Sequence, residues 1–331
     1  MTVSQRTARP ADGSTADATS RAALRDEVLR GLRAVPKALP PKLFYDAAGA
    51  ALFERITTLP EYYLMRAELE ILRAGAGEIA RLAGSRCALV EFGSGAGVKV
   101  RLLLDAFAAA GTPLTAYVPI DISREQLADV STQIAAEYPG VLVRPVCADY
   151  TAPLHIPDLP ERARRVAFFP GSTIGNFHPT EAAAFLRRVR RALAPDGALV
   201  LGVDRRKAPR VLEAAYDDAA GVTAAFNRNL LARLNRELGA DFDLARFRHR
   251  AVWNDAASRI EMHLESTEPQ VVHVAGEPVP FARGETIWTE SSYKYDRPRL
   301  DQLVAEGGFR VERLWTDAGE RFWVALLGMA R

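Results

Sequence analysis

The stretch VEFGSGAGVKVRLLLD, residues 90–105, decides the fold. It passes from a short apolar run through Gly93, Gly95 and Gly97 into apolar residues at helical spacing. This pattern predicts a buried strand, a tight turn and a helix. Glycine lets the backbone approach a ligand closely, and the start of a helix offers free N–H groups. The simplest interpretation is a tight strand–helix turn, and a cofactor site is the functional one.

The spacing of these glycines favours one class of cofactor. The dinucleotide fingerprint is G-x-G-x-x-G/A, whereas this turn has G-x-G-x-G after the acidic Glu91. That spacing is more typical of S-adenosylmethionine binding, because this ligand has no pyrophosphate to hold. We therefore place Gly93 and Gly95 at a cofactor site, with a nicotinamide-dependent oxidoreductase as the alternative.

Strands and helices alternate outward from this turn, which indicates a parallel sheet with helices on both faces. Residues 309–329 are predicted to form two strands that resemble the antiparallel hairpin completing a class I methyltransferase sheet. The predicted fold class is therefore α/β, a Rossmann-like, seven-stranded class I S-adenosylmethionine-dependent methyltransferase with a second, mixed α+β lobe. The other predicted strands lie within residues 86–92, 114–122, 142–150, 164–177 and 197–205.

Residues 209–279 break the alternation and predict a second lobe. They comprise a long helical segment rich in Asn and Arg, followed by two strand–turn–strand patterns. The predicted organisation is a disordered tail (1–20), a substrate-binding lobe (21–66 and 207–293) and a methyltransferase domain (67–206 and 294–331).

Composition limits the partners and the location. The 331 residues carry a formal net charge of +2, which gives no electrostatic case for nucleic acid or an anionic membrane. No apolar run reaches the roughly 18 to 20 residues that span a bilayer. Cys87 and Cys147 lie far apart in apolar runs, so we expect reduced thiols and a cytoplasmic protein. The five histidines show no metal-ligand spacing, and no metal site is predicted.

Polar side chains follow the predicted strands, where open α/β sheets bind ligands. Asp121 ends the second strand and can accept hydrogen bonds from both ribose hydroxyls. Asp149 and Tyr150 end the third, where the carboxylate can accept from an adenine amino group and the ring can pack on the base. Asn176 follows the fourth and offers a donor and an acceptor. A helix cap is the alternative for Asp121, and plain turns are the alternatives for the others.

The stretch TIWTESSYKYD, residues 286–296, alternates polar and larger side chains. In a strand, this alternation places Glu290 and Ser292 on one side and Ser291 and Tyr293 on the other. The stretch is either the solvated face of a strand or one wall of a site. We favour the site, with Glu290 and Ser292 facing its ligand.

Taken together, these stretches resemble the ergothioneine-pathway L-histidine Nα-methyltransferases. The resemblance covers nearly the whole chain from residue 21 and is more specific than the glycine pattern. It implies a two-domain monomer that transfers three methyl groups from S-adenosylmethionine to the α-amino group of histidine, giving hercynine and S-adenosylhomocysteine. The matching stretches are PPKLFYDAAGAALFERITTLPEYYLMRAE, VEFGSG and VKVRLLLDA on either side of Ala96 and Gly97, YVPIDIS, PVCADY, FFPGSTIGNF, AAYDDAAGVTAAFNRNLL, RIEMHLES and GETIWTESSYKY; at Ala96 and Gly97 the chain departs from relatives that have serine or threonine there.

The resemblance also implies roles for individual residues. Glu290 and Ser292 would hold the imidazole beside Met262. Asn176 would hold the amino-acid head group, and Tyr45 would lie near the cofactor and the reacting amine, which makes these two the implied catalytic residues. The substrate-binding set is Tyr62, Gly171, Asn176, Tyr216, Met262, Glu290 and Ser292. The cofactor-binding set is Tyr45, Gly93, Gly95, Lys99, Asp121, Asp149 and Tyr150.

The chemistry requires a neutral amine, and the neighbouring sulfonium lowers the pKa of the ammonium group. We hypothesise that the proton leaves to water or transiently to Tyr45. Trp288 and Ser291 stand where many bacterial relatives have histidine and asparagine, so the pocket is expected to differ in shape. The alternatives are methylation of another aromatic amino acid, such as tryptophan or tyrosine, a nicotinamide-dependent oxidoreductase, and a non-catalytic binding module.

Overall fold

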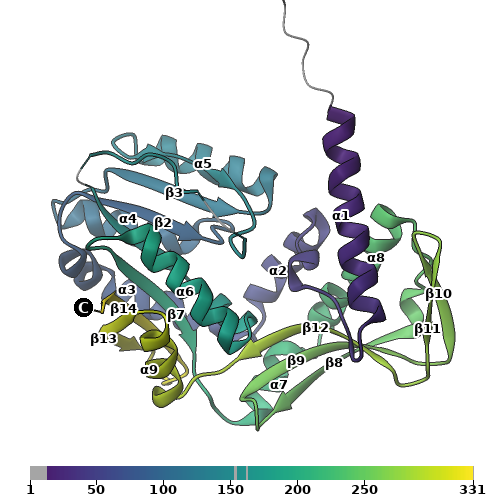
Figure 1. Cartoon of the computed structure of the whole chain (residues 1–331). Coiled ribbons are helices and arrows are strands. Elements are labelled where there is room, and N and C mark those ends of the chain that lie inside the picture. The colour runs from purple at the N-terminus through teal and green to yellow at the C-terminus, as the bar shows by residue number, and fades with distance from the viewer. Residues whose placement is uncertain (1–12, 153–154, 162, 331) are drawn as a thin grey trace, which may run out of the picture.

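A computed structural model describes residues 13–152, 155–161 and 163–330 of the chain (Figure 1). Helix α1 (Gly13–Arg33) begins within the segment that the sequence assigns to a tail. Residues 1–12 of that predicted tail lie outside the described residues. No helix in the described ranges combines the length and the apolar composition needed to cross a bilayer.

The central sheet has eight strands in seven positions, in the order β13, β14, β7, β6, β2, β3 and then β4 with β5. Neighbours are parallel, except that β14 runs antiparallel to both β7 and β13. This order and the closing hairpin confirm the predicted class I methyltransferase fold. The strands are β2 (Cys87–Phe92), β3 (Ala116–Asp121), β4 (Leu142–Val143), β5 (Val146–Cys147), β6 (Arg164–Phe169), β7 (Ala198–Asp204), β13 (Phe309–Thr316) and β14 (Phe322–Met329).

Successive strand residues build two separate cores, one on each face of the sheet. On β2, for example, Leu89 packs into one core and Val90 into the other. Both faces are covered, which explains why every residue of β2 is buried. One face carries α3 (Tyr63–Ala83), α4 (Val98–Ala109) and α5 (Arg124–Glu137), and the other carries α6 (Pro179–Leu193) and α9 (Arg297–Glu306).

The predicted third strand, residues 142–150, is broken into β4 and β5. Pro145 stands between them and has no N–H to donate to the ladder. Only two residues of each piece pair with β3. Strand β5 pairs with the last two residues of β3, and Asp149 follows it two residues later, near Asp121.

The second lobe is a mixed sheet in the order β1, β12, β9, β8, with helices packed on it (Figure 1). Strand β1 pairs parallel to β12, and the other neighbours are antiparallel. Its elements are β1 (Lys37–Ala38), β8 (Phe247–Asn254), β9 (Arg259–Ser266), β12 (Thr286–Tyr293), the hairpin β10 (Gln270–Val274) and β11 (Glu277–Phe281), and helices α2 (Ala47–Thr58), α7 (Pro209–Tyr216) and α8 (Val222–Leu238). Three short 3₁₀ helices are η1 (Pro41–Phe44), η2 (Thr173–Asn176) and η3 (Leu244–Arg246).

The two parts of the chain meet where β12 returns to the central sheet. Tyr295 pairs with Arg205 just beyond the end of β7. On the N-terminal side, α3 runs without a break through residue 67, the predicted domain boundary, and packs on α4 and β14. The division into domains at residues 67, 207 and 294 stays a prediction.

Candidate active site

A cavity of about 670 Å³ opens at the carboxyl ends of β2, β3 and β6. This is the position at which open α/β sheets bind ligands. Tyr45, Phe53 and Tyr62 of the N-terminal segment line its other side. The cavity brings together ten of the predicted site residues: Tyr45, Tyr62, Gly93, Gly95, Lys99, Asp121, Asp149, Tyr150, Gly171 and Asn176.

The glycine-rich turn between β2 and α4 has a backbone that few other residues could adopt. Gly93, Gly95 and Gly97 have φ angles of +75°, +47° and +69°. A Cβ atom on Gly97 would lie 3.0 Å from Cγ1 of Val130. Within the turn, Ser94 is buried and its Oγ has no hydrogen-bond partner among the described residues. The turn therefore fits a ligand that contacts the backbone closely and bonds to this hydroxyl.

Asp121, at the end of β3, joins two turns of the cavity. Its Oδ2 accepts from the backbone N–H of Gly95 at 3.1 Å, and its Oδ1 accepts from that of Ser123 at 3.0 Å. A carboxylate offers about four lone-pair sites. Both oxygens of Asp121 therefore retain capacity for the hydroxyls of a ribose.

Asp149 and Tyr150 place an acceptor beside an aromatic ring. Asp149 Oδ1 accepts from the N–H and the hydroxyl of Thr151 at 2.8 and 2.5 Å. Burial raises the pKa of Asp149, but the bonds from Thr151 and the charge of Lys42 outweigh it and hold the pKa below its ordinary value. The Tyr150 ring packs edge-on against Phe169 at 5.7 Å. This pair suits a flat base that carries an amino group.

Glu91 lines the same cavity as a carboxyl group that stays protonated at neutral pH. Burial raises its pKa to about 8, although the hydroxyl of Tyr117 donates to it at 2.5 Å and Lys99 lies near. The acidic residue before the glycines, noted in the sequence, is therefore a donor as well as an acceptor.

Glu68 is a site residue that the sequence did not single out. Its side chain is fully buried, and its Oε2 lies 2.6 Å from Lys99 Nζ. The backbone N–H of Gly171 donates to both of its oxygens, at 2.8 and 3.0 Å. Glu68 thus fixes Lys99 beside the loop after β6. A single glutamate on an amphipathic helix usually faces solvent, and no local pattern distinguished this one.

Three tyrosines lie where the cavity meets the second lobe: Tyr45 and Tyr62 line the cavity, and Tyr216 ends α7. The rings of Tyr62 and Tyr216 are 6.3 Å apart, and that of Tyr45 packs at 5.8 Å against Phe53. Burial, and then the charges of neighbouring groups including Glu290, raise the pKa values of Tyr45, Tyr62 and Tyr216 well above the ordinary value. All three hydroxyls keep their protons at neutral pH. This disfavours the hypothesis that Tyr45 takes a proton from the amine and leaves water as the acceptor.

Strand β12 carries the predicted imidazole clamp, beside the cavity and outside its lining. The register is regular from Glu290, which lies opposite Met262, to Ser292. Directly paired residues share a face, so Met262 and Glu290 are neighbours. The Ser292 hydroxyl lies 2.7 Å from that of Tyr216, whereas the Tyr293 hydroxyl bonds to His178. Burial raises the pKa of Glu290 to about 7, partly offset by Lys294.

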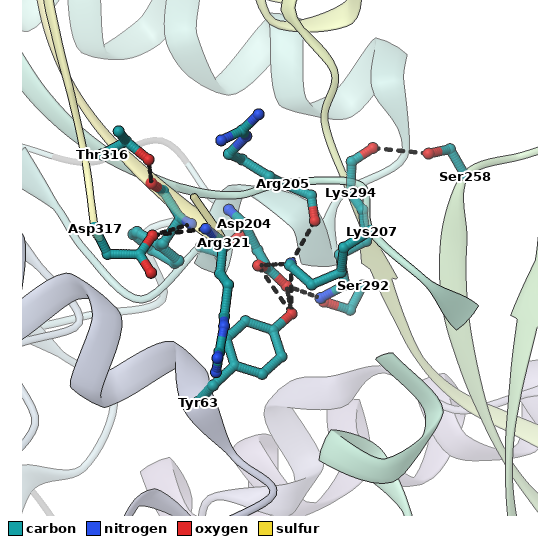
Figure 2. Close-up of polar contacts among 12 residues, drawn as sticks. Tyr63, Asp204, Arg205, Lys207, Ser258, Ser292, Lys294, Thr316, Asp317 and Arg321 are labelled. Carbon is teal, nitrogen blue, oxygen red and sulfur yellow. Dashed lines mark hydrogen bonds and ion pairs between the residues drawn. The ribbon is translucent and has the colours of Figure 1, made fainter. Parts of the chain in front are cut away.

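A buried charge cluster supports this strand from the central sheet (Figure 2). Asp204, at the end of β7, is fully buried and lies 2.6 Å from Lys207 Nζ and 2.8 Å from Lys294 Nζ. The hydroxyl of Tyr63 donates to the same carboxylate at 2.8 Å. Neither Asp204 nor Lys207 was predicted from the sequence as a site residue. The sequence signal that could have identified Asp204 is its position at the end of a predicted strand, which it shares with Asp121.

Known proteins similar to this chain identify its family. Residues 24–329 match the family described as histidine-specific, S-adenosylmethionine-dependent methyltransferases. The chain is 47% identical over 306 residues to a histidine N-alpha-methyltransferase of Mycolicibacterium smegmatis, covering 92% of this chain and 94% of that one. It is 45% identical over 309 residues to the protein of the same name from Mycobacterium tuberculosis, covering 92% and 94%. It is also 31% identical to ergothioneine biosynthesis protein 1 of Neurospora crassa, covering 89% of this chain and 34% of that protein. The chain therefore belongs to the family of histidine-specific, S-adenosylmethionine-dependent methyltransferases.

Proposed function

We propose that the protein transfers three methyl groups in turn from S-adenosylmethionine to the α-amino group of L-histidine, which gives hercynine and begins ergothioneine biosynthesis. One observation carries this proposal. The cavity joins the cofactor-type residues of the central sheet to the tyrosines next to the Glu290 strand. The names of the relatives, at 45–47% identity over nearly their whole length, support the substrate and the product.

The residues at the sheet edge fit the cofactor. The backbone of Gly93 and Gly95 approaches it, Asp121 accepts from its ribose, and Asp149 and Tyr150 hold its adenine. Lys99, held by its ion pair with Glu68, supplies a positively charged group to the cavity wall. S-adenosylmethionine supplies the methyl group and a positive sulfonium.

The substrate lies between the cavity and β12 in this proposal. Asn176 and Tyr62 line the cavity and, with Tyr216 and Gly171, bind the amino-acid head group. The imidazole reaches β12, where Glu290 and Ser292 bond to its nitrogens and Met262 packs beside it. These contacts aim the amine at the methyl group.

The chain's contribution to the reaction is positioning more than acid–base chemistry. Holding two reactants in line removes most of the entropic cost of their encounter. Asn176 and the tyrosine hydroxyls orient the amine through hydrogen bonds, while the raised pKa values keep these phenols neutral. The amine loses its proton to water before each transfer, helped by the nearby positive charge.

The deciding experiment is incubation of the purified protein with S-adenosylmethionine and a panel of amino acids, followed by mass spectrometry. Stepwise addition of three methyl groups to histidine alone is the expected result. Methylation of tryptophan or tyrosine in preference to histidine would support the nearest alternative. Calorimetric titration with S-adenosylhomocysteine and with a nicotinamide dinucleotide separates the methyltransferase from an oxidoreductase, and only the first is expected to bind.

We further propose that the protein works as a monomer in the cytoplasm, without a nucleic-acid partner. The two cysteines are free, Cys87 buried and Cys147 exposed, which suits a reducing compartment. Sedimentation equilibrium at several concentrations tests the monomer, and a mass near twice 36.2 kDa would contradict it.

A further inference from the structure

Lys294 is the most deeply buried cation that faces the substrate-binding strand. It follows β12 directly, and only 1% of it is exposed. Its Nζ lies 2.8 Å from Asp204 Oδ2, 2.8 Å from the Tyr216 hydroxyl and 2.8 Å from Ser292 Oγ. An ammonium group has three N–H donors and no acceptor. Each donor therefore has one acceptor, and Lys294 is fully engaged.

Lys294 belongs to a buried cluster with Asp204, Lys207 and Tyr63 (Figure 2). Burial raises the pKa of Asp204, but Lys294 and Lys207 outweigh that effect and hold the pKa below its ordinary value. Tyr63 donates to the same carboxylate and carries no charge, because burial raises the pKa of its hydroxyl.

The contacts of Lys294 determine which of the two hydroxyls, Ser292 or Tyr216, donates a hydrogen bond to the other. Both hydroxyls accept from Lys294, and they bond to one another at 2.7 Å. A phenol is more acidic than an aliphatic alcohol, so Tyr216 is the donor and Ser292 the acceptor in that bond. Ser292 Oγ then accepts twice, from Lys294 and Tyr216, which uses both of its lone pairs. Its own proton is left to point at the ligand.

We propose that Lys294 is a positioning residue, which commits Ser292 to act only as a donor and so makes the site take the uncharged imidazole ring of histidine. One ring N–H bonds to Glu290, two positions earlier on the same face of β12, and the bare ring nitrogen accepts from Ser292. An imidazolium ring has no bare nitrogen, and an indole has only its N–H. Both are rejected for the same reason: the Ser292 proton would face a group that cannot accept it. This inference rests on the proposed function.

The direct test is ¹⁵N NMR of ring-labelled histidine bound to the wild-type protein with S-adenosylhomocysteine. The measurement is made near pH 6, where a free ring with a pKa of about 6.5 is mostly protonated. One protonated and one bare nitrogen are expected in the complex. Two protonated nitrogens would overturn the inference while leaving the proposed function intact. Absence of histidine binding and methylation in the wild type would instead overturn the proposed function.

Lys294→Met then tests the source of the effect. Its KM for histidine should rise by about tenfold or more, because Ser292 is no longer held as a donor to the bare ring nitrogen, and the bound ring should become partly protonated at the same pH. Affinity for S-adenosylhomocysteine should be unchanged. A ring that stays neutral, with an unchanged KM, would contradict the role of Lys294.

Two further variants make this result specific. Lys207→Met removes a cation from the same carboxylate without touching Ser292 or Tyr216, so the ring signals should stay as in the wild type. If Lys294→Met does not fold, the double variant Asp204→Asn/Lys294→Met removes the ion pair as a unit and is measured in the same way. A protonated ring in Lys207→Met would show that charge alone is responsible and would overturn the inference.

Discussion

In the proposed function, Glu290 is the residue that decides between histidine and other aromatic amino acids. Glu290→Ala removes the acceptor for the ring N–H, a hydrogen bond to a charged group that contributes about 1.5–3 kcal/mol. The value of kcat/KM for histidine should therefore fall by about 10- to 100-fold, while that for tryptophan rises relative to it. Steady-state kinetics on both amino acids measure the change. Glu277→Ala, in the hairpin of the second lobe, is the control, and unchanged constants for histidine in Glu290→Ala would exclude the clamp.

The same carboxylate lowers the stability of the unliganded protein at high pH. Burial raises the pKa of Glu290 from 4.5 to about 7. When folding raises the pKa of an acidic group, the stability of the folded state is highest below the unfolded-state pKa. That stability is lost as the pH rises through the folded-state pKa. Glu290→Gln cannot ionise, so its melting temperature relative to the wild type should rise between about pH 4 and pH 8. Thermal unfolding across this range checks the slope, and a difference that stays constant with pH would show that the carboxylate is not desolvated.

At the scale of elements, sequence patterns were sufficient wherever periodicity and burial agree. The glycine turn, the positions of the strands and the closing hairpin all followed from local signals. The third strand was predicted at the correct place in the chain, but its predicted range, residues 142–150, is longer than the observed strands, because Pro145 breaks the pairing with β3. The residues that fix the site side chains in place could not be predicted from local sequence patterns. Glu68 meets Lys99 from 31 positions away along the chain, and no periodic pattern reports such a pairing.

The packing of β7 against α3 provides a test of that contact. A Cβ atom on Gly202 would lie 2.2 Å from Glu68 Oε1, so Gly202→Ala must displace the carboxylate that fixes Lys99 and Gly171. We expect the affinity for S-adenosylhomocysteine to fall by about tenfold, roughly 1.4 kcal/mol, as measured by calorimetry. Gly140→Ala is the matched control, because nothing lies within 4 Å of its added methyl group. A folded Gly202→Ala protein with the affinity of the wild type would contradict the anchoring role of Glu68.

At the scale of the whole molecule, the second lobe is joined to the sheet through buried charge. The chain returns from β12 through Lys294, whose backbone bonds to Ser258 on one side while its ammonium group reaches Asp204 on the other (Figure 2). Asp204, Lys207 and Lys294 come from segments about 90 residues apart in sequence. Each looks locally like an ordinary charged residue at the end of a strand, and only the closed fold reveals that they share one site.

Breaking this junction from one side should destabilise the molecule strongly. Asp204→Ala leaves Lys294 buried without its counter-ion, and breaking a buried pair from one side costs about 3–5 kcal/mol. The free energy of unfolding, measured with denaturant, should fall by that amount. The control is Asp301→Ala, whose pair with Arg297 on α9 is about half exposed, and its effect should stay within about 0.5 kcal/mol. Equal effects of the two substitutions would mean that the lobes are held together by their apolar contacts, with the buried charges serving only the orientation of Ser292.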